Sequence, residues 1–376
     1  MNAVAERIRD AYETRRPLRI RGAGTWLGAG RPVPGGESLS LGDDRGIVEY
    51  VPGDLTLTAR AGTPLAEIVA ATGAHGQWLP LDPWGGDAGT LGGTVSTASA
   101  GPHAHAMGLP RDVVLGMEFV SGRGDVIRAG GRVVKNVAGF DLSRLLVGSW
   151  GTLGVVTEVT VRLRARPDQT RTLGIGVSTA PAALNELALR LRTLPFTPLA
   201  SELVSAALAS RLGIGGGSGA MLLCRIGGNE RSLKGQVDLL RGFGQMTEMA
   251  EELWQQLRVV EATTSMTAAW RFSQLPTRFG ETWSAAEQGT RALDSALMHG
   301  NPARGVVRIV ARGEAAALAR AAAAFDGTTA VESLPPDAWP LVTSRPAGDS
   351  VSTAIRLKFD PRGILNTGIL GVSAGA

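Results

Sequence analysis

The sequence contains one cysteine and four histidines, and each shortage excludes a kind of site. A single cysteine, Cys224, cannot form an intrachain disulfide, and it cannot hold an iron–sulfur cluster, which needs about four thiolates. It lies in an apolar run, residues 220–226, with the composition of a buried strand, so a core thiol is expected. The histidines show no HExxH or comparable zinc-binding spacing. Any redox chemistry therefore has to come from an organic cofactor.

Long hydrophobic runs are also absent. Every apolar run is broken by Gly, Arg or Thr before the ~18 residues that a membrane-spanning helix needs. The N-terminal residues include Glu6, Asp10 and Glu13 and lack the apolar segment of a secretory signal. They fit instead an amphipathic helix that ends before Pro17. The sequence therefore predicts a cytoplasmic protein with no direct membrane span, whose membrane association would come only through partner subunits.

Lysine is scarce as well, and the positive charge comes almost wholly from arginine. Lysine occurs only at Lys135, Lys234 and Lys358, while the net charge is +4 and the pI is about 9.8. Such a basic balance raises the question of nucleic-acid binding. The arginines are scattered among acidic residues and form no basic block, so no nucleic-acid partner is expected.

A chain of 376 residues is long for a single core, so two domains are expected. Up to about residue 166, short strands alternate with Gly/Pro turns too irregularly for one doubly wound parallel sheet. Beyond Pro167, strand–helix pairs indicate a second α+β domain with an antiparallel sheet. We therefore predict domains at 1–168 and 169–344 and a C-terminal segment at 345–376. The expected strands are 46–50, 56–61, 112–120, 155–164, 172–177, 220–226 and 305–312, and the expected helices are 63–73 with Thr63 as N-cap, 136–147, 182–193, 229–242 and 314–325.

Three glycine-rich segments occupy the first part of the chain: residues 21–25, 87–101 and 148–158. Glycine lets the backbone approach a ligand closely, and successive exposed N–H groups form concavities that bind phosphate. Each segment lies near a strand-like run rich in β-branched residues. Together they indicate a site for one large anionic cofactor, a dinucleotide.

The glycine spacing excludes a Rossmann fingerprint. That motif needs GxGxxG opening a helix and an acidic residue about twenty positions later, whereas Gly22 and Gly24 are followed by the loop-like residues 26–32. A plain strand-to-strand turn is the alternative for the first segment. A Gly/Ser-rich surface loop is the alternative for the second, although Leu91 and Val95 indicate a packed segment whose N–H and O–H groups could donate to a pyrophosphate.

Three longer motifs give the resemblance its specificity: TLGG at 90–93, KNVAGFDLSRLLVGSWGTLGVVTE at 135–158 and KFDPRGILNTG at 358–368. Together they resemble the FAD-binding vanillyl-alcohol oxidase/p-cresol methylhydroxylase (PCMH-type) family. Residues 60–68 and 270–273 are most similar to those of E-type subunits of bacterial glycolate oxidases. The resemblance implies an α+β fold, with a PCMH-type FAD-binding domain of two α+β subdomains, a small α+β cap domain with an antiparallel sheet, and a chain end that returns to the cofactor.

The resemblance also implies which residues contact FAD. Many relatives attach the flavin covalently through a histidine in the first glycine segment or a cysteine in the second. Neither residue type occurs in these segments here, so non-covalent binding is expected. His103 and His105, just beyond the second segment, either approach the flavin or form a polar turn. The residues matched are Arg21, Gly22, Ala23, Gly24 and Thr25 in the first segment; Thr90, Gly92, Gly93, Ser96, Ser99, Ala100 and Gly101 in the second; Gly148, Thr152, Gly154, Val155 and Val156 beside the adenosine and ring system; and Lys358 and Asn366 in the returning tail.

No catalytic residue can be assigned from the sequence. The larger D-type relatives have a histidine-rich cap motif with a metal, whereas this chain has only His299, followed by Gly300, in that region. His299 is interpreted as the cap of a helix end rather than a base. Trp270 and Arg271 form either a stacking and carboxylate-binding pair or an inward-packed strand residue beside a solvated arginine. No metal site is expected.

The resemblance implies an FAD subunit of a glycolate oxidase complex. Such a subunit oxidises a 2-hydroxy acid to a 2-oxo acid, or relays electrons to an iron–sulfur subunit, and its partners are a larger flavin-binding D-type subunit and that iron–sulfur subunit. A second interpretation is a non-catalytic assembly subunit whose FAD is structural or absent. A third is a stand-alone oxidase, against which the short cap and the missing base argue.

Overall fold

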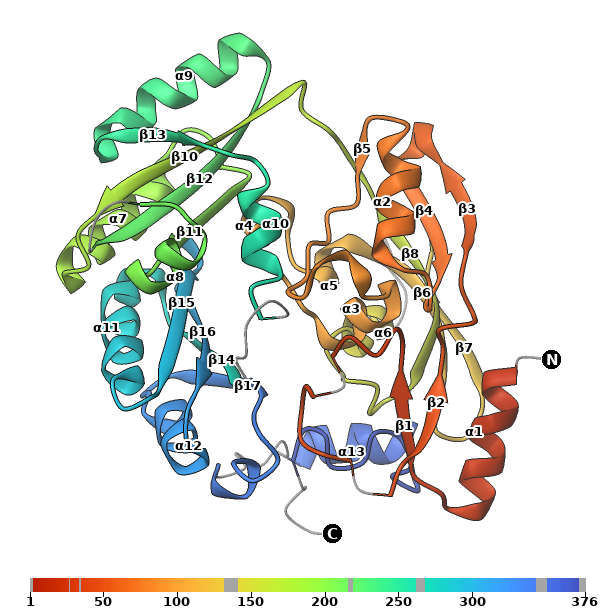
Figure 1. The fold of residues 1–376 in the computed structure, drawn as a ribbon. Helices are drawn as coiled ribbons and strands as arrows, with labels where there is room; N and C mark the ends of the chain where they lie inside the picture. The colour runs from red at the N-terminus through yellow and green to blue at the C-terminus, as the bar shows by residue number, and fades with distance from the viewer. Residues whose placement is uncertain are drawn as a thin grey trace. The chain divides into compact units, whose positions relative to one another are not determined.

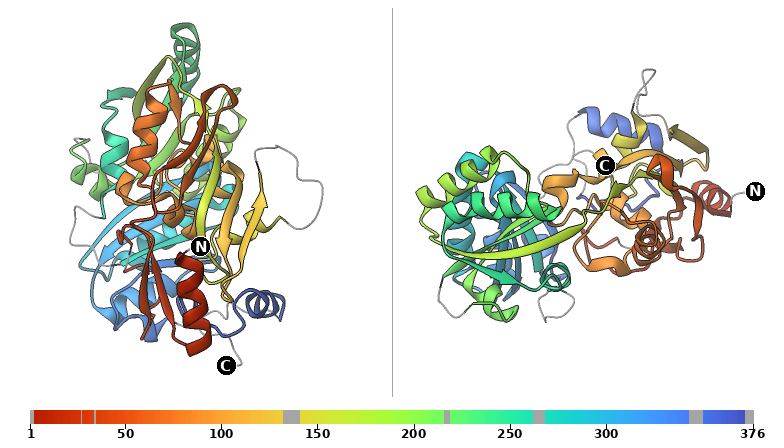
Figure 2. Two further views of the ribbon diagram at one scale, coloured as in Figure 1. Left: turned by 90° about the vertical axis from the view of Figure 1, so that its right-hand side faces the viewer. Right: turned by 90° about the horizontal axis from the view of Figure 1, so that it is seen from above.

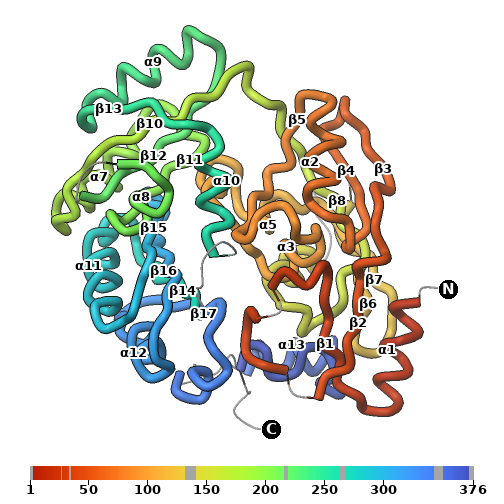
Figure 3. The backbone as a smooth tube through the Cα atoms, viewed as in Figure 1, coloured from red at the N-terminus to blue at the C-terminus, as the bar shows by residue number. Residues whose placement is uncertain are grey.

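The computed structural model describes residues 3–26, 28–33, 35–131, 141–215, 219–261, 268–342 and 350–371. The chain forms two compact units, which can be followed by colour along the trace in Figure 3. Unit 1 contains Met1–Gly101, Gly108–Arg166 and Ser344–Ala376, and unit 2 contains Pro102–Met107 and Pro167–Thr343. Each unit therefore combines segments that are far apart in the sequence. No helix within the described ranges is both long and apolar enough to cross a bilayer.

The larger sheet of unit 1 has five antiparallel strands in the order β3-β4-β8-β6-β7. Its central strand β8 largely alternates buried and half-buried residues, as expected of a strand with one face on a core. Val159 and Val161 of β8 are fully buried there with Phe119 of β6. The strands are β3 (Ile47–Val51), β4 (Thr56–Arg60), β6 (Val114–Val120), β7 (Val126–Gly130) and β8 (Val155–Arg162).

A smaller sheet in unit 1 joins the two ends of the described chain. Strand β1 (Leu18–Arg21) pairs in parallel with β2 (Glu37–Ser40), and Leu18 also forms a parallel bridge with Leu365 near the C-terminus. Helix α1 (Ala3–Thr14) buries one apolar face and lies beside β6, as the left view of Figure 2 shows. The remaining elements of unit 1 are α2 (Leu65–Gly73), β5 (Gln77–Trp78), α3 (Leu91–Thr97), α5 (Pro110–Val113), α6 (Leu142–Leu146), β9 (Arg164–Ala165) and α13 (Ser350–Phe359).

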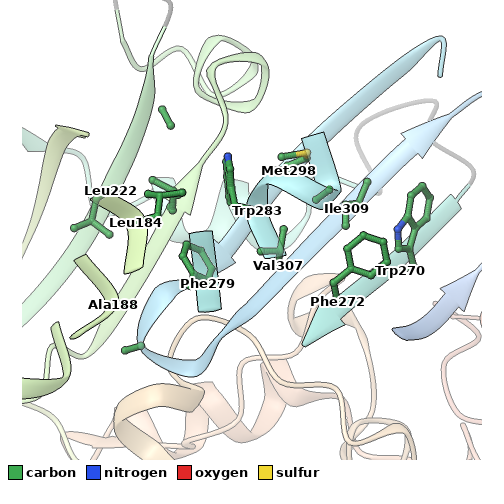
Figure 4. Packing of buried hydrophobic residues seen from close by; sticks show 14 of the residues in the cluster. Leu184, Ala188, Leu222, Trp270, Phe272, Phe279, Trp283, Met298, Val307 and Ile309 are labelled. Carbon is green, nitrogen blue, oxygen red and sulfur yellow. The ribbon is translucent and has the colours of Figure 1, made fainter. Parts of the chain in front are cut away.

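Unit 2 is built on an eight-stranded antiparallel sheet in the order β13-β10-β12-β11-β15-β16-β14-β17. Helices α7, α9, α11 and α12 cover one face and enclose the core (Figure 1). Figure 4 shows Phe279 and Trp283 of α11 packed in this core, together with Phe272 and Ile309 from the sheet. The elements are α4 (Ala104–Met107), β10 (Gln169–Val177), α7 (Pro181–Thr193), β11 (Ala200–Val204), α8 (Ala206–Arg211), β12 (Ala220–Gly228), α9 (Glu230–Leu240), β13 (Met246–Met249), α10 (Leu253–Arg258), β14 (Ala268–Ser273), α11 (Phe279–Thr290), β15 (Ser295–Asn301), β16 (Val306–Arg312), α12 (Ala315–Ala323) and β17 (Thr328–Ser333).

The opposite face of this sheet carries buried charged groups. His299, Arg308 and Arg271 are cross-strand neighbours in one row of β15, β16 and β14. Arg308 is 2% exposed and donates to Glu332 through Nε at 2.9 Å and Nη2 at 2.7 Å, and it also forms an ion pair with Glu261. Burial alone would lower the pKa of Arg308, but the two carboxylates together raise it above its ordinary value. The guanidinium therefore stays charged inside the unit.

Most of the elements expected from the sequence are confirmed within one to three residues at each end. Strands β3, β4, β10, β12 and β16 and helices α1, α7, α9 and α12 fall in the expected ranges. The strand expected at 112–120 is shorter, because Pro110–Val113 form helix α5, and the one expected at 155–164 ends at Arg162. Of the helix expected at 136–147, residues 136–140 lie outside the described residues, and Leu142–Leu146 form α6.

The expected N-cap of α2 was wrong. The helix begins at Leu65 with Pro64 in the cap position, and no side chain caps it. The hydroxyl of Thr63 instead accepts from the amide of Gly46 at 2.8 Å and donates to its carbonyl at 3.1 Å. Thr63 therefore connects the start of β3 to the entry of α2.

Cys224 lies in the core of unit 2, as the apolar run around it predicted. Its side chain is completely buried, and burial raises the pKa of the thiol to about 12. At pH 8 only ~10⁻⁴ of the thiol would be ionised, and the thiolate is the reactive form. We expect iodoacetamide to leave the folded chain unmodified and to alkylate its single cysteine after unfolding in guanidinium chloride. Rapid alkylation of the folded chain, measured by mass spectrometry, would contradict this burial.

Candidate functional site

A cavity in unit 1 brings together the three glycine-rich segments and the C-terminal tail. It contains about 990 Å³ of atom-free space, a volume that includes solvent at its open side. Its walls come from the loop after β1, the segment leading into α3, the turn before β8 and the chain end. The lining residues are Arg19–Trp26, Ala29, Leu41, Ala61, Pro83–Gly86, Gly89, Thr90, Gly92–Thr94, Ser96, Thr97, Ser99, Trp150, Gly151, Gly154–Val156, Asn366 and Ile369.

The loop after β1 presents free main-chain donors to this cavity. The amides from Gly22 to Trp26 donate no hydrogen bond within the part of the chain that the structure describes. Gly24 has φ +78°, a left-handed conformation that side chains disfavour. The loop therefore offers several adjacent N–H groups, the arrangement that binds phosphate oxygens.

Gly22 is required where the first and second glycine segments meet. A Cβ atom at this position would overlap Oγ1 of Thr90 and lie 3.1 Å from its Cγ2. Thr90 cannot move away without loss, because its Oγ1 caps α3 by accepting from the amide of Gly93 at 3.1 Å and its side chain is buried. The absence of a side chain at position 22 thus sets the distance between the two segments.

The second segment differs from the packed loop that the sequence suggested. Residues Leu91–Thr97 form helix α3, and the N–H groups of its first turn are used inside the protein. Gly92 donates to the carbonyl of Ala61 at 2.8 Å, and Gly93 donates to Thr90. A Cβ on Gly92 would lie 2.6 Å from that of Ala61, so this glycine permits close packing of α3. What this segment offers the cavity is surface and hydroxyl groups rather than free amides of Gly92 and Gly93.

The third segment is held by the end of α3. Gly148 donates to the carbonyl of Val95 at 3.0 Å, and Trp150 donates to that of Ser96 at 2.8 Å. Trp150 has φ +54°, which is unusual for a large side chain. Its ring lies 6.5 Å from that of Trp26, with 38° between the planes. The segment then enters β8, whose first residues Val155 and Val156 form part of the cavity wall.

The structure brings most of the sequence-predicted residues to the cavity and leaves five outside its lining. Gly101 packs against the main chain of Asp82, and the Thr152 hydroxyl donates to the carbonyl of Ser149 at 2.7 Å. Gly148, with φ +80°, shapes the turn beside Ala98. The predicted residues that line the cavity are Arg21, Gly22, Ala23, Gly24, Thr25, Thr90, Gly92, Gly93, Ser96, Ser99, Gly154, Val155, Val156 and Asn366; those that do not are Ala100, Gly101, Gly148, Thr152 and the exposed Lys358 on α13.

Sequence reasoning missed a fourth lining segment, Pro83–Gly86, and the tryptophans. Gly85 and Gly86 both have positive φ, and a Cβ on Gly85 would lie 2.9 Å from Nε1 of Trp26. Trp84 is buried in the same wall. Gly85 and Gly86 form an adjacent pair like Gly92 and Gly93, which is a comparable signal in the sequence. They lack the neighbouring strand-like run that marked the other glycine-rich segments.

The cavity is positively charged and partly aromatic. Its only charged lining residues in the described chain are Arg19 and Arg21, and its lining contains no carboxylate and no imidazole. Arg19 is partly buried, and this burial lowers the pKa of its guanidinium. These features fit FAD: amides and arginines suit a diphosphate, and the indoles of Trp26, Trp84 and Trp150 offer apolar planes to ring systems.

The candidate catalytic residues of the cap sequence lie in unit 2, where the interpretation of His299 changes and one alternative for Trp270 and Arg271 is favoured. His299 is not at a helix end: it lies within β15, is 1% exposed, and its Nδ1 is 3.1 Å from Oε2 of Glu202. Trp270 is fully buried in the core of the sheet, and Arg271 on the other face lies 3.8 Å from Glu332. The structure therefore favours the inward-packed strand residue over the stacking pair.

The histidines beyond the second segment are also part of unit 2. Nε2 of His103 lies 2.9 Å from Nη1 of Arg225. Burial, and then the charges of Arg304 and Arg192, lower the pKa of His105, so it is neutral at pH 7. Within the described ranges no three His, Cys, Asp or Glu side chains are grouped as metal ligands would be.

Comparisons with known proteins agree with this geometry. Residues 1–130 match the family model of an FAD binding domain. Glycolate oxidase subunit GlcE of Escherichia coli K12 is 38% identical over 257 residues, which is 68% of this chain and 67% of that protein. Glycolate oxidase subunit GlcD of Bacillus subtilis is 40% identical over 162 residues, 43% of this chain and 34% of that protein. The chain thus spans about two thirds of one relative and one third of the other.

Solved structures show the fold class. A p-cresol methylhydroxylase with substrate bound superposes with a TM-score of 0.78 and 16% identity, over 99% of this chain and 87% of the other. An alkyldihydroxyacetonephosphate synthase gives 0.69 and 14%, over 97% of this chain and 75% of the other. At these identities the likeness concerns the fold alone. The α+β, PCMH-type architecture expected from the sequence motifs is confirmed.

Proposed function

The chain belongs to the family of FAD-linked glycolate oxidase subunits, and from that membership we propose that it is the FAD-binding subunit of a glycolate oxidase (glycolate dehydrogenase) complex. In this role it oxidises a 2-hydroxy acid to a 2-oxo acid or relays electrons from that oxidation. Its partners are a larger flavin-binding D-type subunit, like GlcD, and an iron–sulfur subunit that receives the electrons. The complex is cytoplasmic, and any membrane association comes from the partners.

One observation carries the proposal of a non-covalent FAD: adjacent free amides meet a positively charged cavity. Four consecutive residues, Gly22 to Thr25, present N–H groups that have no acceptor in the described chain. Arg19 and Arg21, just before these residues, also line the cavity. Among the described residues the lining contains no acidic side chain. A diphosphate is the part of FAD that such a set would hold, because charge-assisted bonds to phosphate are roughly twice as strong as neutral ones.

The other lining residues have separate roles in this proposal. The hydroxyls of Ser96 and Ser99 orient the cofactor along α3, and Gly154 to Val156 present main-chain edges to a flat ring. Trp26, Trp84 and Trp150 shield the rings from water. Bound FAD supplies the two-electron chemistry that this chain's own cysteine and histidines cannot. Of the remaining predicted residues, Gly101, Gly148 and Thr152 shape turns beside the site, and Ala100 and Lys358 do not belong to its lining.

A second candidate function is a non-catalytic assembly subunit in which FAD is structural. The observation that favours it is the chemistry of the cavity wall. Proton abstraction from a 2-hydroxy acid needs a base within hydrogen-bond reach, and among the described residues the lining carries neither imidazole nor carboxylate. Electron relay from the flavin of a D-type partner would not need such a base.

Anaerobic addition of glycolate separates the two functions. The chain is purified with its partners and alone, and its visible flavin absorption is recorded before and after glycolate. Bleaching of this chain's flavin in isolation supports catalysis by the chain. Bleaching only with the D-type partner supports electron relay, and a flavin that stays oxidised in the working complex supports the structural role. A preparation that never retains FAD contradicts the proposal.

A further inference from the structure

The C-terminal tail extends the small sheet of unit 1 beside β1, the strand that leads into the free amides. Leu18 donates to the carbonyl of Ile364 at 2.7 Å, and Asn366 donates to the carbonyl of Leu18 at 2.9 Å. Ile364 and Leu365 are buried in the core of the unit, and Figure 3 shows the blue chain end beside the red strand. The tail is therefore held to the edge of β1 by an isolated parallel bridge, and its last main-chain hydrogen bond to β1 is made by Asn366.

Asn366 continues these bonds with its side chain. The backbone of Asn366 turns away from β1 with φ +44°. The next amide of β1, that of Ile20, therefore donates to the side-chain oxygen Oδ1 of Asn366, at 2.8 Å, instead of to a main-chain carbonyl. Its Nδ2 donates to the carbonyl of Trp150 at 2.7 Å. Asparagine tolerates the left-handed region better than most residues, which suits both demands.

These bonds connect two walls of the cavity. Ile20 precedes the free amides by two residues, and Trp150 is the left-handed residue that carries one of the lining indoles. Strain at such a residue persists only when its surroundings over-determine it. Asn366 holds its carbonyl, and Ser96 accepts from its amide. Gly151 allows the approach, since a Cβ there would lie 2.9 Å from Nδ2 of Asn366.

The turn before Asn366 is fixed by a buried carboxylate. Oδ1 and Oδ2 of Asp360 accept from the amides of Ile364 at 3.1 Å and Leu365 at 2.8 Å. The preceding residue, Phe359, accepts through its carbonyl from the amide of Gly122, in the turn between β6 and β7, at 2.9 Å. The tail is thus anchored on both sides of the turn, and Asn366 arrives at one defined place.

We propose that Asn366 is a positioning residue that clasps the loop after β1 to the Trp150 turn, so that docking of the tail and FAD binding stabilise each other. The inference rests on the proposed binding of FAD in this cavity. Linkage requires the coupling to be reciprocal: whatever tail docking adds to FAD affinity, FAD adds to tail docking. The side chain acts through the loops it holds, although it also borders the cavity.

The test measures FAD affinity of the full chain with three variants. Asn366→Gly keeps the left-handed backbone but loses both side-chain bonds, and it should bind FAD about 10-fold more weakly. Asn366→Asp keeps the acceptor for Ile20, loses the donor to Trp150 and adds a charge. It should bind FAD about 100-fold more weakly. Thr367→Asp adds the same charge to the neighbouring exposed residue without touching the clasp, and it should change the affinity less than about 3-fold.

Hydrogen exchange gives a readout that a merely structural loss would not move. In the wild type, FAD should slow the exchange of the amides of Leu18, Ile20 and Asn366. In Asn366→Gly, FAD should leave the exchange rates of the tail amides, residues 364–371, unchanged. Circular dichroism of the apoproteins checks that the variants fold. A wild-type chain that binds no FAD overturns the proposed function and this inference with it. Variants that bind FAD like a binding-competent wild type, with the same protection of the tail, overturn the inference alone.

Discussion

Replacing Gly22 with alanine is expected to weaken FAD binding about 100-fold, because the added Cβ would overlap Oγ1 of Thr90 and push the amide-bearing loop away from α3. Thr90 is buried and caps that helix, so its side chain cannot simply rotate away. The apoprotein is titrated with FAD, and binding is monitored through the quenching of its tryptophan fluorescence. Thermal unfolding without FAD checks that the variant still folds.

A double-mutant cycle with Thr90→Ala locates the cause. Thr90→Ala alone removes the cap of α3 and should cost about 1 kcal/mol of stability. It also removes the atoms that an alanine at position 22 would meet most closely. The two substitutions together should therefore bind FAD more tightly than the sum of their separate effects predicts. Strictly additive losses would show that the contact between the two segments does not set the loop's position.

Replacing Arg308 with methionine is expected to destabilise unit 2 by about 3 kcal/mol, because it removes the buried cation from the carboxylates of Glu332 and Glu261 and leaves Glu332 only the more distant Arg271. Arg308 is 2% exposed and pairs with both Glu332 and Glu261. Urea unfolding of the full chain, followed by circular dichroism, measures the loss. FAD affinity serves as a second readout and should change little, since Arg308 does not line the cavity.

The matched control removes a carboxylate together with the cation. Glu332→Leu in the Arg308→Met background should recover much of the lost stability, because a buried pair replaced by apolar residues of similar volume is often neutral or stabilising. The single substitution Glu332→Leu should lower the free energy of unfolding less than Arg308→Met does, because Glu261 still pairs with Arg308. A loss below about 1 kcal/mol for Arg308→Met would mean that water reaches this network in solution.

Part of the cofactor half was predictable from sequence because the residue type itself marks the constraint, even where the neighbour that imposes it is distant in the chain. Glycine positions such as Gly22 and Gly24 report where the backbone must approach a neighbour or turn left-handed, and these needs are visible in the chain itself. The resemblance of the tail motif also identified Asn366, although its role depends on β1, which lies more than 300 residues earlier. Composition and periodicity also predicted part of unit 2, namely strands β10, β12 and β16 and helices α7, α9 and α12, whereas its other strands and helices were not predicted.

The sequence failed where tertiary contacts decide. Leu91–Thr97 contain two glycines and β-branched residues, a poor helix composition, yet they form α3 because Thr90 caps the first turn and Ala61 accepts from Gly92. His299 was taken for a helix end because Gly300 follows it, but pairing with β11 and β16 places it inside a sheet. The sequence also contains no sign that Pro102–Met107 belong to unit 2 while the residues on both sides belong to unit 1. The four-residue helix in this segment is too short to show a periodic pattern.

We expect the loop after β1 to hold the diphosphate of one FAD in the cavity of unit 1. Isothermal titration of the full apoprotein with FAD, alone and with ADP as competitor, tests it most directly. We expect one FAD per chain and competition by ADP, which carries the same diphosphate, and in Gly22→Ala the affinities for FAD and for ADP should fall together. An apoprotein that takes up no FAD at any excess, or FAD binding that ADP and Gly22→Ala leave untouched, would contradict it.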